Sequence, residues 1–263
     1  MSILIKRREY DILSLYIEEG EYMIEIKNIS KSYIKGTKII DNMNLEIKDG
    51  EILGFIGPNG AGKTTVIKMM TGILGIDEGD ILIDGKSIRY DPYEAKKNIG
   101  LIPDSPDMFL NLKGIEYLNF MADIYKIGKE DRIKIIQELS KKFDIDNALN
   151  EKIESYSHGM RQKIVIIGAL LHSPKNWILD EPITGLDPKA IYDLKSIMKE
   201  YAKKGNTVFF STHILEVAEN LCDRVAIINK GKILFVGTIN ELKTRMKENI
   251  SLEELFMEII KDD

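Results

Sequence analysis

The chain has 263 residues, of which 44% are hydrophobic and 30% are charged, and its formal net charge is −5. This composition is typical of a folded globular protein and argues against disorder. The negative balance, with Lys and Glu interleaved, argues against a nucleic-acid partner, because duplex binding needs a clustered basic face. The single cysteine, Cys222, excludes an internal disulfide and suits a reducing compartment.

Residues 1–22 precede the first strand-like segment and are interpreted as an N-terminal extension. The alternation of apolar and polar residues over 23–29 predicts a half-buried strand that begins at Met23. The Glu/Gly run over 18–21 is what a purine-rich ribosome-binding site would encode if it were read in frame. We therefore expect translation to start at Met23, with a genuine amphipathic extension as the alternative.

Short strands separated by turns are predicted from residue 23 to about 90. Residues 39–47 and 79–85 are strand-like, and the apolar run 51–56 predicts a short buried strand. The turn after 51–56 reads G-P-N-G-A-G-K-T and is followed by a predicted helix over 65–70. This order of strand, glycine-rich loop and helix is that of a phosphate-binding loop.

Each fixed position of this loop has a physical role. Its glycines let successive backbone N–H groups point at a polyphosphate, and the positive end of the following helix faces the same anion. Lys63 can reach the β- and γ-phosphates, and Thr64 offers a hydroxyl to Mg²⁺. The predicted nucleotide-binding residues here are Gly57, Pro58, Asn59, Gly60, Ala61, Gly62, Lys63, Thr64 and Thr65.

The pattern changes to a helical period between residues 91 and 160. Stretches over 114–125, 130–143 and 147–153 carry apolar residues at helical spacing and predict a helical insertion of about 95–160. From 160 to 237 predicted helices (160–172, 189–204, 214–222) alternate with predicted strands (176–180, 207–211, 224–229). Continuous apolar strands that alternate with helices predict an α/β fold with a parallel sheet covered on both faces.

A carboxylate pair, Asp180 and Glu181, ends the predicted strand 176–180. An acid at this point can hold Mg²⁺ through its water, and a second acid at the carboxyl edge of the sheet can polarise an attacking water. The alternative is a pair of acids that merely ends a strand at the surface. The phosphate-binding loop in the same chain favours the catalytic interpretation.

Motifs in five places occur in the order and approximate spacing of an ABC-type ATPase. Residues 57–64, 157–162, 177–181, 185–187 and His213 resemble its phosphate loop, signature, magnesium strand, D-loop and histidine switch. The resemblance covers about 23–237. It implies a P-loop NTPase core over 23–240 with an N-terminal antiparallel β portion, an inserted helical subdomain and a C-terminal helical tail over 241–263.

The resemblance also implies roles for individual residues. Tyr33 occupies the position of the aromatic ring that stacks on adenine, with an ordinary strand-edge tyrosine as the alternative. Asp180 would support Mg²⁺, Glu181 would be the general base, and His213 would contact the γ-phosphate. Ser157 and Gly159 would serve the nucleotide of the opposite subunit. That arrangement implies a head-to-tail homodimer, or a heterodimer with a paralogue, around two ATP molecules.

One position departs from the pattern of the family. Asp104 stands where the family generally has a glutamine, and a carboxylate accepts hydrogen bonds but cannot donate as an amide does. Contacts of Asp104 with Mg²⁺ and water are expected. An acid here resembles the exporter branch of bacterial ABC ATPases, which pair with separate permeases. Residues 105–112 would then line the groove for the permease's coupling helix, and residues 251–260 resemble the short C-terminal helix of such subunits.

The function expected is that of an ATP-hydrolysing motor subunit that powers a separate membrane permease, with export favoured over import. No stretch approaches the roughly 18 apolar residues of a membrane span, so we expect a position at the cytoplasmic face of the membrane, held by the permease. A soluble ABC ATPase is disfavoured, since the chain carries one copy of each motif. A binding module without hydrolysis is disfavoured because Lys63, Asp180, Glu181 and His213 are all present.

Overall fold

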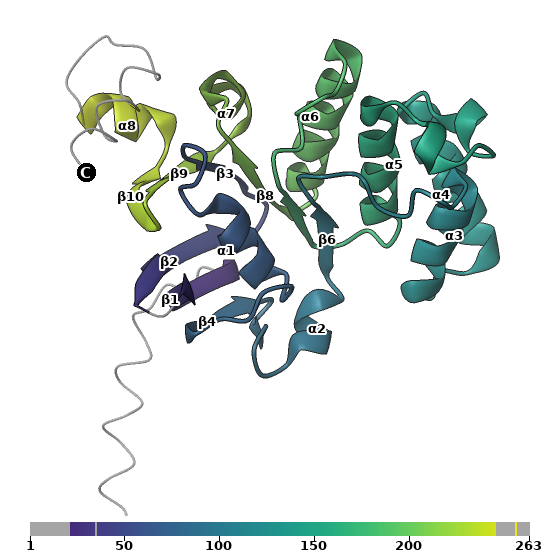
Figure 1. The fold of residues 1–263 in the computed structure, drawn as a ribbon. Helices are drawn as coiled ribbons and strands as arrows, with labels where there is room; N and C mark the ends of the chain where they lie inside the picture. Colours follow the sequence, from purple (N-terminus) through teal and green to yellow (C-terminus); the bar gives the residue numbers. More distant parts are fainter. Residues whose placement is uncertain (1–21, 35, 246–255, 257–263) are drawn as a thin grey trace, which may run out of the picture.

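Two β-sheets form the frame of the molecule (Figure 1). The computed structural model describes residues 22–34, 36–245 and 256. The four-stranded sheet has the order β2-β1-β4-β5 and is antiparallel. The six-stranded sheet has the order β10-β9-β3-β8-β7-β6, in which β10 is antiparallel to β9 and the remaining pairs are parallel. The predicted α/β fold with an N-terminal antiparallel portion is confirmed.

The described elements follow in chain order. The strands are β1 (Tyr22–Ile34), β2 (Thr37–Lys48), β3 (Ile52–Ile56), β4 (Glu78–Ile83), β5 (Lys86–Ser87), β6 (Ile99–Ile102), β7 (Asn176–Leu179), β8 (Thr207–Thr212), β9 (Arg224–Asn229) and β10 (Lys232–Gly237). The helices are α1 (Lys63–Met70), α2 (Pro92–Lys96), α3 (Gly114–Ile124), α4 (Lys129–Lys142), α5 (His158–Leu170), α6 (Pro188–Lys203), α7 (Leu215–Leu221) and α8 (Ile239–Arg245). The predicted extension over 1–22 lies, apart from Tyr22, outside the described residues, as does the predicted tail helix over 251–260 apart from Phe256.

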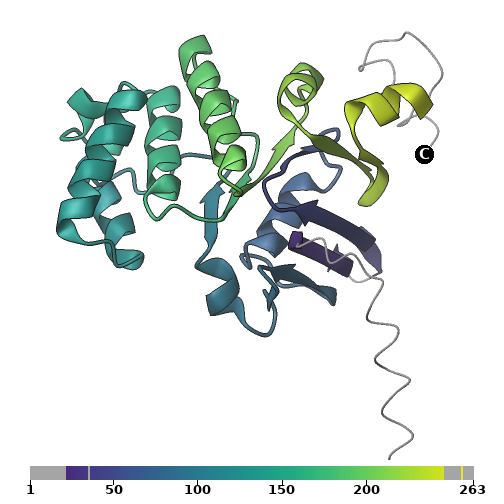
Figure 2. The same ribbon diagram turned by 180° about the vertical axis from the view of Figure 1, so that it is seen from behind.

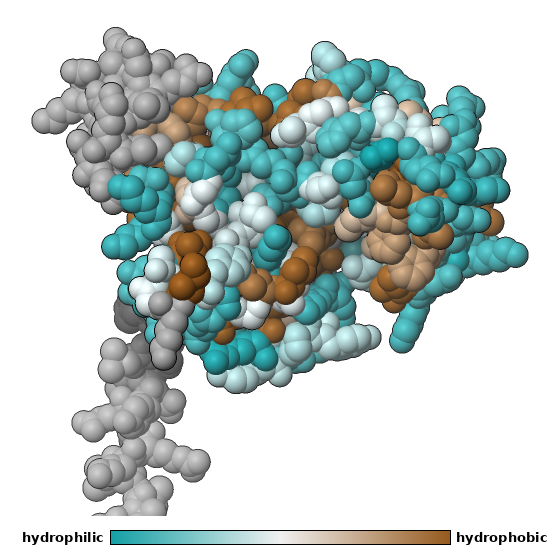
Figure 3. Space-filling model, viewed as in Figure 1, coloured by the Kyte–Doolittle hydropathy of each residue, from teal (hydrophilic) through white to brown (hydrophobic). Residues whose placement is uncertain are grey.

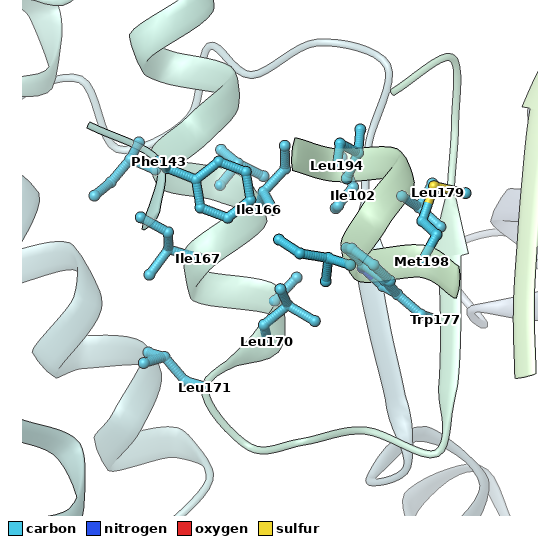
Figure 4. Close-up of a cluster of buried hydrophobic side chains, with 14 of the residues drawn as sticks. Ile102, Phe143, Ile166, Ile167, Leu170, Leu171, Trp177, Leu179, Leu194 and Met198 are labelled. Atoms are coloured by element: carbon cyan, nitrogen blue, oxygen red, sulfur yellow. The ribbon is translucent and has the colours of Figure 1, made fainter. Parts of the chain in front are cut away.

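The six-stranded sheet is buried on both faces, as its continuous apolar strands require. Successive residues of a strand point to opposite faces, so Phe209 packs in the cluster with α1 and β1, whereas Val208 and Phe210 pack in the cluster with α5 and α6. Helix α1 therefore lies between the two sheets. Figure 4 shows the other cluster, in which the α5 side chains face Trp177 of β7 and Met198 of α6.

Helices α3, α4 and α5 form a lobe at one side of the sheets (Figures 1 and 2). The predicted helix over 147–153 is wrong, because that segment holds two single 3-10 turns, η1 (Asp146–Ala148) and η2 (Ile153–Ser155). Its backbone pairs instead with the chain before α3: the Ile153 amide donates to the Leu112 carbonyl at 2.9 Å. Strand β6 lies inside the predicted insertion but pairs with β7 in the sheet. None of the described helices has the length and apolar character that crossing a bilayer requires.

His172 connects the lobe to the sheet as a neutral, packed side chain. Its ring stacks on Tyr125 with 3.5 Å between centroids and 3° between planes. Its Nε2 lies 3.1 Å from the Ile99 carbonyl oxygen, which can only accept, so the proton resides on Nε2. Nδ1 is buried and finds no partner among the described residues. Burial lowers the pKa of His172 to about 4 from 6.5.

Acid is therefore expected to destabilise the fold through His172. Between pH 6.5 and 4 the unfolded chain binds a proton that the folded chain excludes, so this contribution to stability is complete above 6.5 and is lost as pH falls toward 4. From near pH 7 to near pH 5 the loss is about 2 kcal/mol in the free energy of unfolding. His172→Phe keeps a ring on Tyr125 and removes the titration. Urea unfolding of both proteins at the two pH values checks this, and an equal loss in the variant contradicts it.

Candidate nucleotide-binding site

The predicted phosphate-binding loop lies between β3 and α1, as its sequence requires. Strand β3 is buried throughout, and Gly62, with a φ of 109°, is the N-cap of α1. That backbone angle is in the left-handed region that glycine adopts without steric cost. A Cβ added to Gly57 would lie 2.4 Å from the Ile228 carbonyl oxygen of β9, so no larger residue fits there. These two glycines fix the loop over the carboxyl edge of the sheet.

A cavity of about 600 Å³ opens above this loop. It is lined by Ile39, Asn59, Gly60, Gly62, Lys63, Thr64, Thr65, Asp104, Glu181, Thr184 and His213. The structure thus gathers residues from five separate stretches of the sequence around one space. Ile39 and Thr184 were not predicted. Thr184 lies shortly after the carboxylate pair, so the motif there could have indicated it. Ile39 lies on β2 of the four-stranded sheet, and no sequence motif surrounds it.

Lys63, Glu181 and His213 form a continuous polar chain across the cavity. The Lys63 Nζ lies 3.4 Å from the Glu181 Oε1, and the His213 Nδ1 lies 3.0 Å from the Glu181 Oε2. Lys63 also donates to the carbonyls of Gly57 and Pro58 at 2.8 and 3.3 Å. The side chain of Lys63 is 7% exposed, so its charge is met by oxygen atoms of the protein itself.

Ser211 of β8 holds the carboxylate pair in place, a role that sequence reasoning missed. Its hydroxyl donates to the Asp180 Oδ1 at 2.6 Å, and it accepts from the Glu181 amide at 2.9 Å. Asp180 is 2% exposed, whereas the Glu181 backbone turns out of the strand with a φ of 46°. A left-handed glutamate is strained, and such strain concentrates at functional sites. Glu181 therefore lines the cavity, whereas Asp180 is buried and does not.

The remaining predicted residues lie at different distances from this cavity. Tyr33 is 58% exposed, and its hydroxyl is 3.4 Å from the Thr65 Oγ1, which places it beside the loop without lining the cavity. Ser157 is the N-cap of α5 and accepts from the Met160 amide at 3.3 Å. A Cβ on Gly159 would lie 3.1 Å from the Gly185 carbonyl oxygen. Ser157 and Gly159 are not among the residues that line the cavity.

Oxygen atoms suited to a magnesium ion surround the loop. Thr64 and Asp104 line the cavity, and the buried Asp180 carboxylate directly precedes the lining residue Glu181 in the chain. Mg²⁺ is held in nucleotide enzymes by one or two protein oxygens, several waters and the phosphates themselves. Within the described part of the chain no three His, Cys, Asp or Glu side chains form a ready metal cluster. The hydroxyl and carboxylate oxygens present fit an ion that arrives with a nucleotide.

Comparisons with known proteins show the family to which the chain belongs. Residues 40–184 match the family model described as ABC transporter. The chain is 39% identical over 220 residues to the ABC transporter ATP-binding protein YhcH of Bacillus subtilis (strain 168), which covers 83% of this chain and 71% of that protein. It is 34% identical over 224 residues to the linearmycin resistance ATP-binding protein LnrL of the same organism, covering 85% and 72%.

Solved structures share the fold over most of their length. The structure of an ATP-binding subunit of an ABC transporter has a TM-score of 0.85 and 32% identity, over 90% of this chain and 99% of that one. The dimeric post-hydrolysis state of the ATP-binding cassette MJ0796, bound to ADP and Pi, has a TM-score of 0.73 and 27% identity, over 82% and 99%. The chain therefore belongs to the ATP-binding subunits of ABC transporters, the ATPases that work with membrane permeases.

Proposed function

We propose that this chain is the ATPase of an exporter and that it acts as a dimer on a separate membrane permease. Export is supported by Asp104 in place of the usual glutamine and by the name of LnrL, which links that relative to resistance against linearmycin. A transporter that confers resistance moves the compound away from its target. An importer is the alternative. The ATPase unit is proposed to span about 23–240, with the helical insertion inside it.

In the proposed cycle each cavity residue has a role that its position supports. Lys63, Thr64 and Thr65 bind the phosphates on the loop, and Tyr33 stacks on the base. Thr64, Asp180 and Asp104 hold Mg²⁺, which neutralises the charge of the phosphates. Ser157 and Gly159 cap the nucleotide of the second subunit, which explains why they lie outside this chain's own cavity.

Glu181 is proposed to take the proton of the water that attacks the γ-phosphate. Its position at the carboxyl end of β7 points it into the cavity, and the hydrogen bond with His213 at 3.0 Å orients its carboxylate. In this structure Lys63 pairs with Glu181 at 3.4 Å. The γ-phosphate then replaces that carboxylate as the partner of Lys63, which leaves Glu181 to accept the proton of water.

An apolar groove supports the proposal that the chain binds a membrane permease. The docking segment, residues 105–112, follows Asp104, and its Met108 and Phe109 line this groove with Ile73 and Leu101. Phe109 is 43% exposed and has a φ of 55°, a strained backbone for a bulky side chain. Figure 3 shows apolar surface on this face, over α3 and the chain before it. A helix with an apolar face suits such a groove.

The groove predicts how the complex responds to substitution. The full chain purified from detergent-solubilised membranes is expected to carry a protein with several membrane spans. Phe109→Ser removes the exposed ring and should reduce its recovery by about tenfold, the loss that one truncated aromatic anchor produces. Tyr192→Ser on α6, where the ring is 73% exposed, is the matched control and should retain the partner. A wild-type chain without such a partner contradicts the proposal.

The direction of transport is tested separately. Inside-out vesicles that contain the complex present the ATPase to the outer solution. With ATP added there, an exporter drives a compound that binds the permease into the lumen. Loss of preloaded compound from the lumen instead indicates an importer.

A further inference from the structure

Asp107 lies in the docking segment, which joins the nucleotide cavity to the apolar groove. Three residues before it, Asp104 lines the cavity, and directly after it Met108 and Phe109 line the groove. The Asp107 side chain is half exposed, and its carboxylate is bound by Arg161, 54 residues further along the chain. This ion pair therefore connects the chain between two functional surfaces to helix α5.

Arg161 is held at two points rather than one. Its Nη1 donates to the Asp107 Oδ1 at 2.7 Å, and its Nη2 donates to the Glu154 carbonyl at 2.8 Å. The arginine side chain is 23% exposed. Two donors in a rigid plane fix the orientation of a guanidinium, which a lysine ammonium cannot reproduce. The pair therefore differs from a surface ion pair between two freely moving side chains, whose contribution is small.

The ion pair between Asp107 and Arg161 leads to Ser157, the serine of the signature motif. Ser157 is the N-cap of α5, and the Arg161 amide donates to the Ser157 carbonyl at 3.0 Å. Residues four apart in a helix lie on the same face, so the Arg161 side chain is anchored one turn from Ser157. The bond to Glu154 fixes the chain that enters the helix. Asp107 and Glu154 thus hold the start of α5 from both sides.

We infer that Arg161 is a positioning residue that sets the Ser157 hydroxyl relative to the docking segment. In this role Arg161 would hold the Ser157 hydroxyl in position to bind the nucleotide of the second subunit. It would also couple the position of Ser157 to that of the docking segment, which lines the groove for the permease. The inference rests on the proposed ATP-bound dimer. Arg161 is assigned no contact with nucleotide, because its guanidinium is bound to Asp107 and to the Glu154 carbonyl.

Dimer formation in Mg²⁺-ATP separates positioning from general stability. In a full-length Glu181→Gln background, which blocks hydrolysis, sedimentation measures the dimer and a fluorescent ATP analogue measures binding to the monomer. Arg161→Gln is expected to weaken the dimer by about tenfold or more, the effect of one lost charge-assisted hydrogen bond. Affinity of the monomer for the analogue should stay within about twofold, because the change lies outside its own cavity.

Arg132 offers a matched control in the same lobe. Its Nη2 donates to the Asp123 Oδ1 at 2.5 Å and to the Ile127 carbonyl at 2.9 Å, and the arginine is 16% exposed. Its Nη1 also donates to the Asn119 Oδ1 at 3.4 Å. Arg132→Gln therefore removes a partly buried arginine with a comparable carboxylate and carbonyl contact, without touching Ser157 or the docking segment, and it should leave the dimer intact. Asp107→Asn is isosteric and half exposed, so it tests the same link if Arg161→Gln does not fold.

The outcomes distinguish this inference from the proposed function. Asp107→Asn should weaken the dimer in the same direction as Arg161→Gln. Adding Asp107→Asn to Arg161→Gln should change little, because the Asp107 contact is already lost with the arginine. Arg161→Gln that dimerises like its parent, or that loses no more than Arg132→Gln, overturns the inference while the proposed dimer stands. A parent that stays monomeric in Mg²⁺-ATP overturns the proposed dimer itself.

Discussion

Glu181→Gln is expected to reduce kcat for ATP hydrolysis by about 10²–10⁴-fold, the contribution typical of a positioned general base. The amide keeps the shape of the side chain and can still accept a hydrogen bond, but it cannot take a proton from water at neutral pH. The carboxylate is 14% exposed and is held by Lys63 and His213, so it is a positioned base that bulk solvent does not replace. Steady-state phosphate release measures the effect.

The same substitution should tighten ATP binding. The Glu181 carboxylate is the anion that Lys63 faces at 3.4 Å, and a neutral amide competes less well with phosphate for the ammonium. Glu219→Gln is the control, because Glu219 pairs with Lys243 at 2.5 Å on α7 and α8 and does not line the cavity. Hydrolysis that persists at the wild-type rate in Glu181→Gln excludes this residue as the base. Weaker ATP binding contradicts the exchange of partners at Lys63.

Local motifs made most of the nucleotide cavity predictable from the sequence. The glycines of the phosphate loop determine its backbone conformation locally. The apolar strand before Asp180 indicates that the two acids lie at the carboxyl edge of the sheet. Those residues lie within short stretches whose backbone is determined locally. The structure brings Lys63, Glu181 and His213 together as the parallel sheet predicts, since all three follow neighbouring strands at one edge.

Contacts made by sequence-distant segments were not predictable in this way. Ser211 reads as part of an apolar strand, and its two bonds to the acid pair depend on the register of β7 beside β8. The pattern over 147–153 has helical spacing, but the Ile153 amide donates to the Leu112 carbonyl, and the Leu149 and Glu151 carbonyls accept from the first residues of α3. The Arg161–Asp107 pair likewise spans 54 residues. The spacing of apolar residues indicates which face of a segment is buried. It does not indicate which other segment of the chain its backbone will hydrogen-bond with.

Lys63→Met is expected to weaken ATP binding by about 100-fold or more, because one charge-assisted contact with a phosphate in a buried site contributes about 3 kcal/mol. Methionine keeps the length and apolar stem of the side chain. It removes the ammonium that now bonds to the Gly57 and Pro58 carbonyls at 2.8 and 3.3 Å. Titration of the purified chain with a fluorescent ATP analogue measures the affinity.

The expected loss of ATP affinity in Lys63→Met has a second cause, which does not apply to a substitution of a lysine outside the cavity. Without the ammonium, the Glu181 carboxylate remains in the cavity with His213 as its partner, and we expect it to repel the γ-phosphate. Lys63→Met with Glu181→Gln should therefore recover part of the affinity that Lys63→Met loses. Lys68→Met, an exposed lysine on the same helix α1, should bind ATP normally. If Lys63→Met and Lys68→Met bind ATP equally well, the phosphates do not occupy this loop.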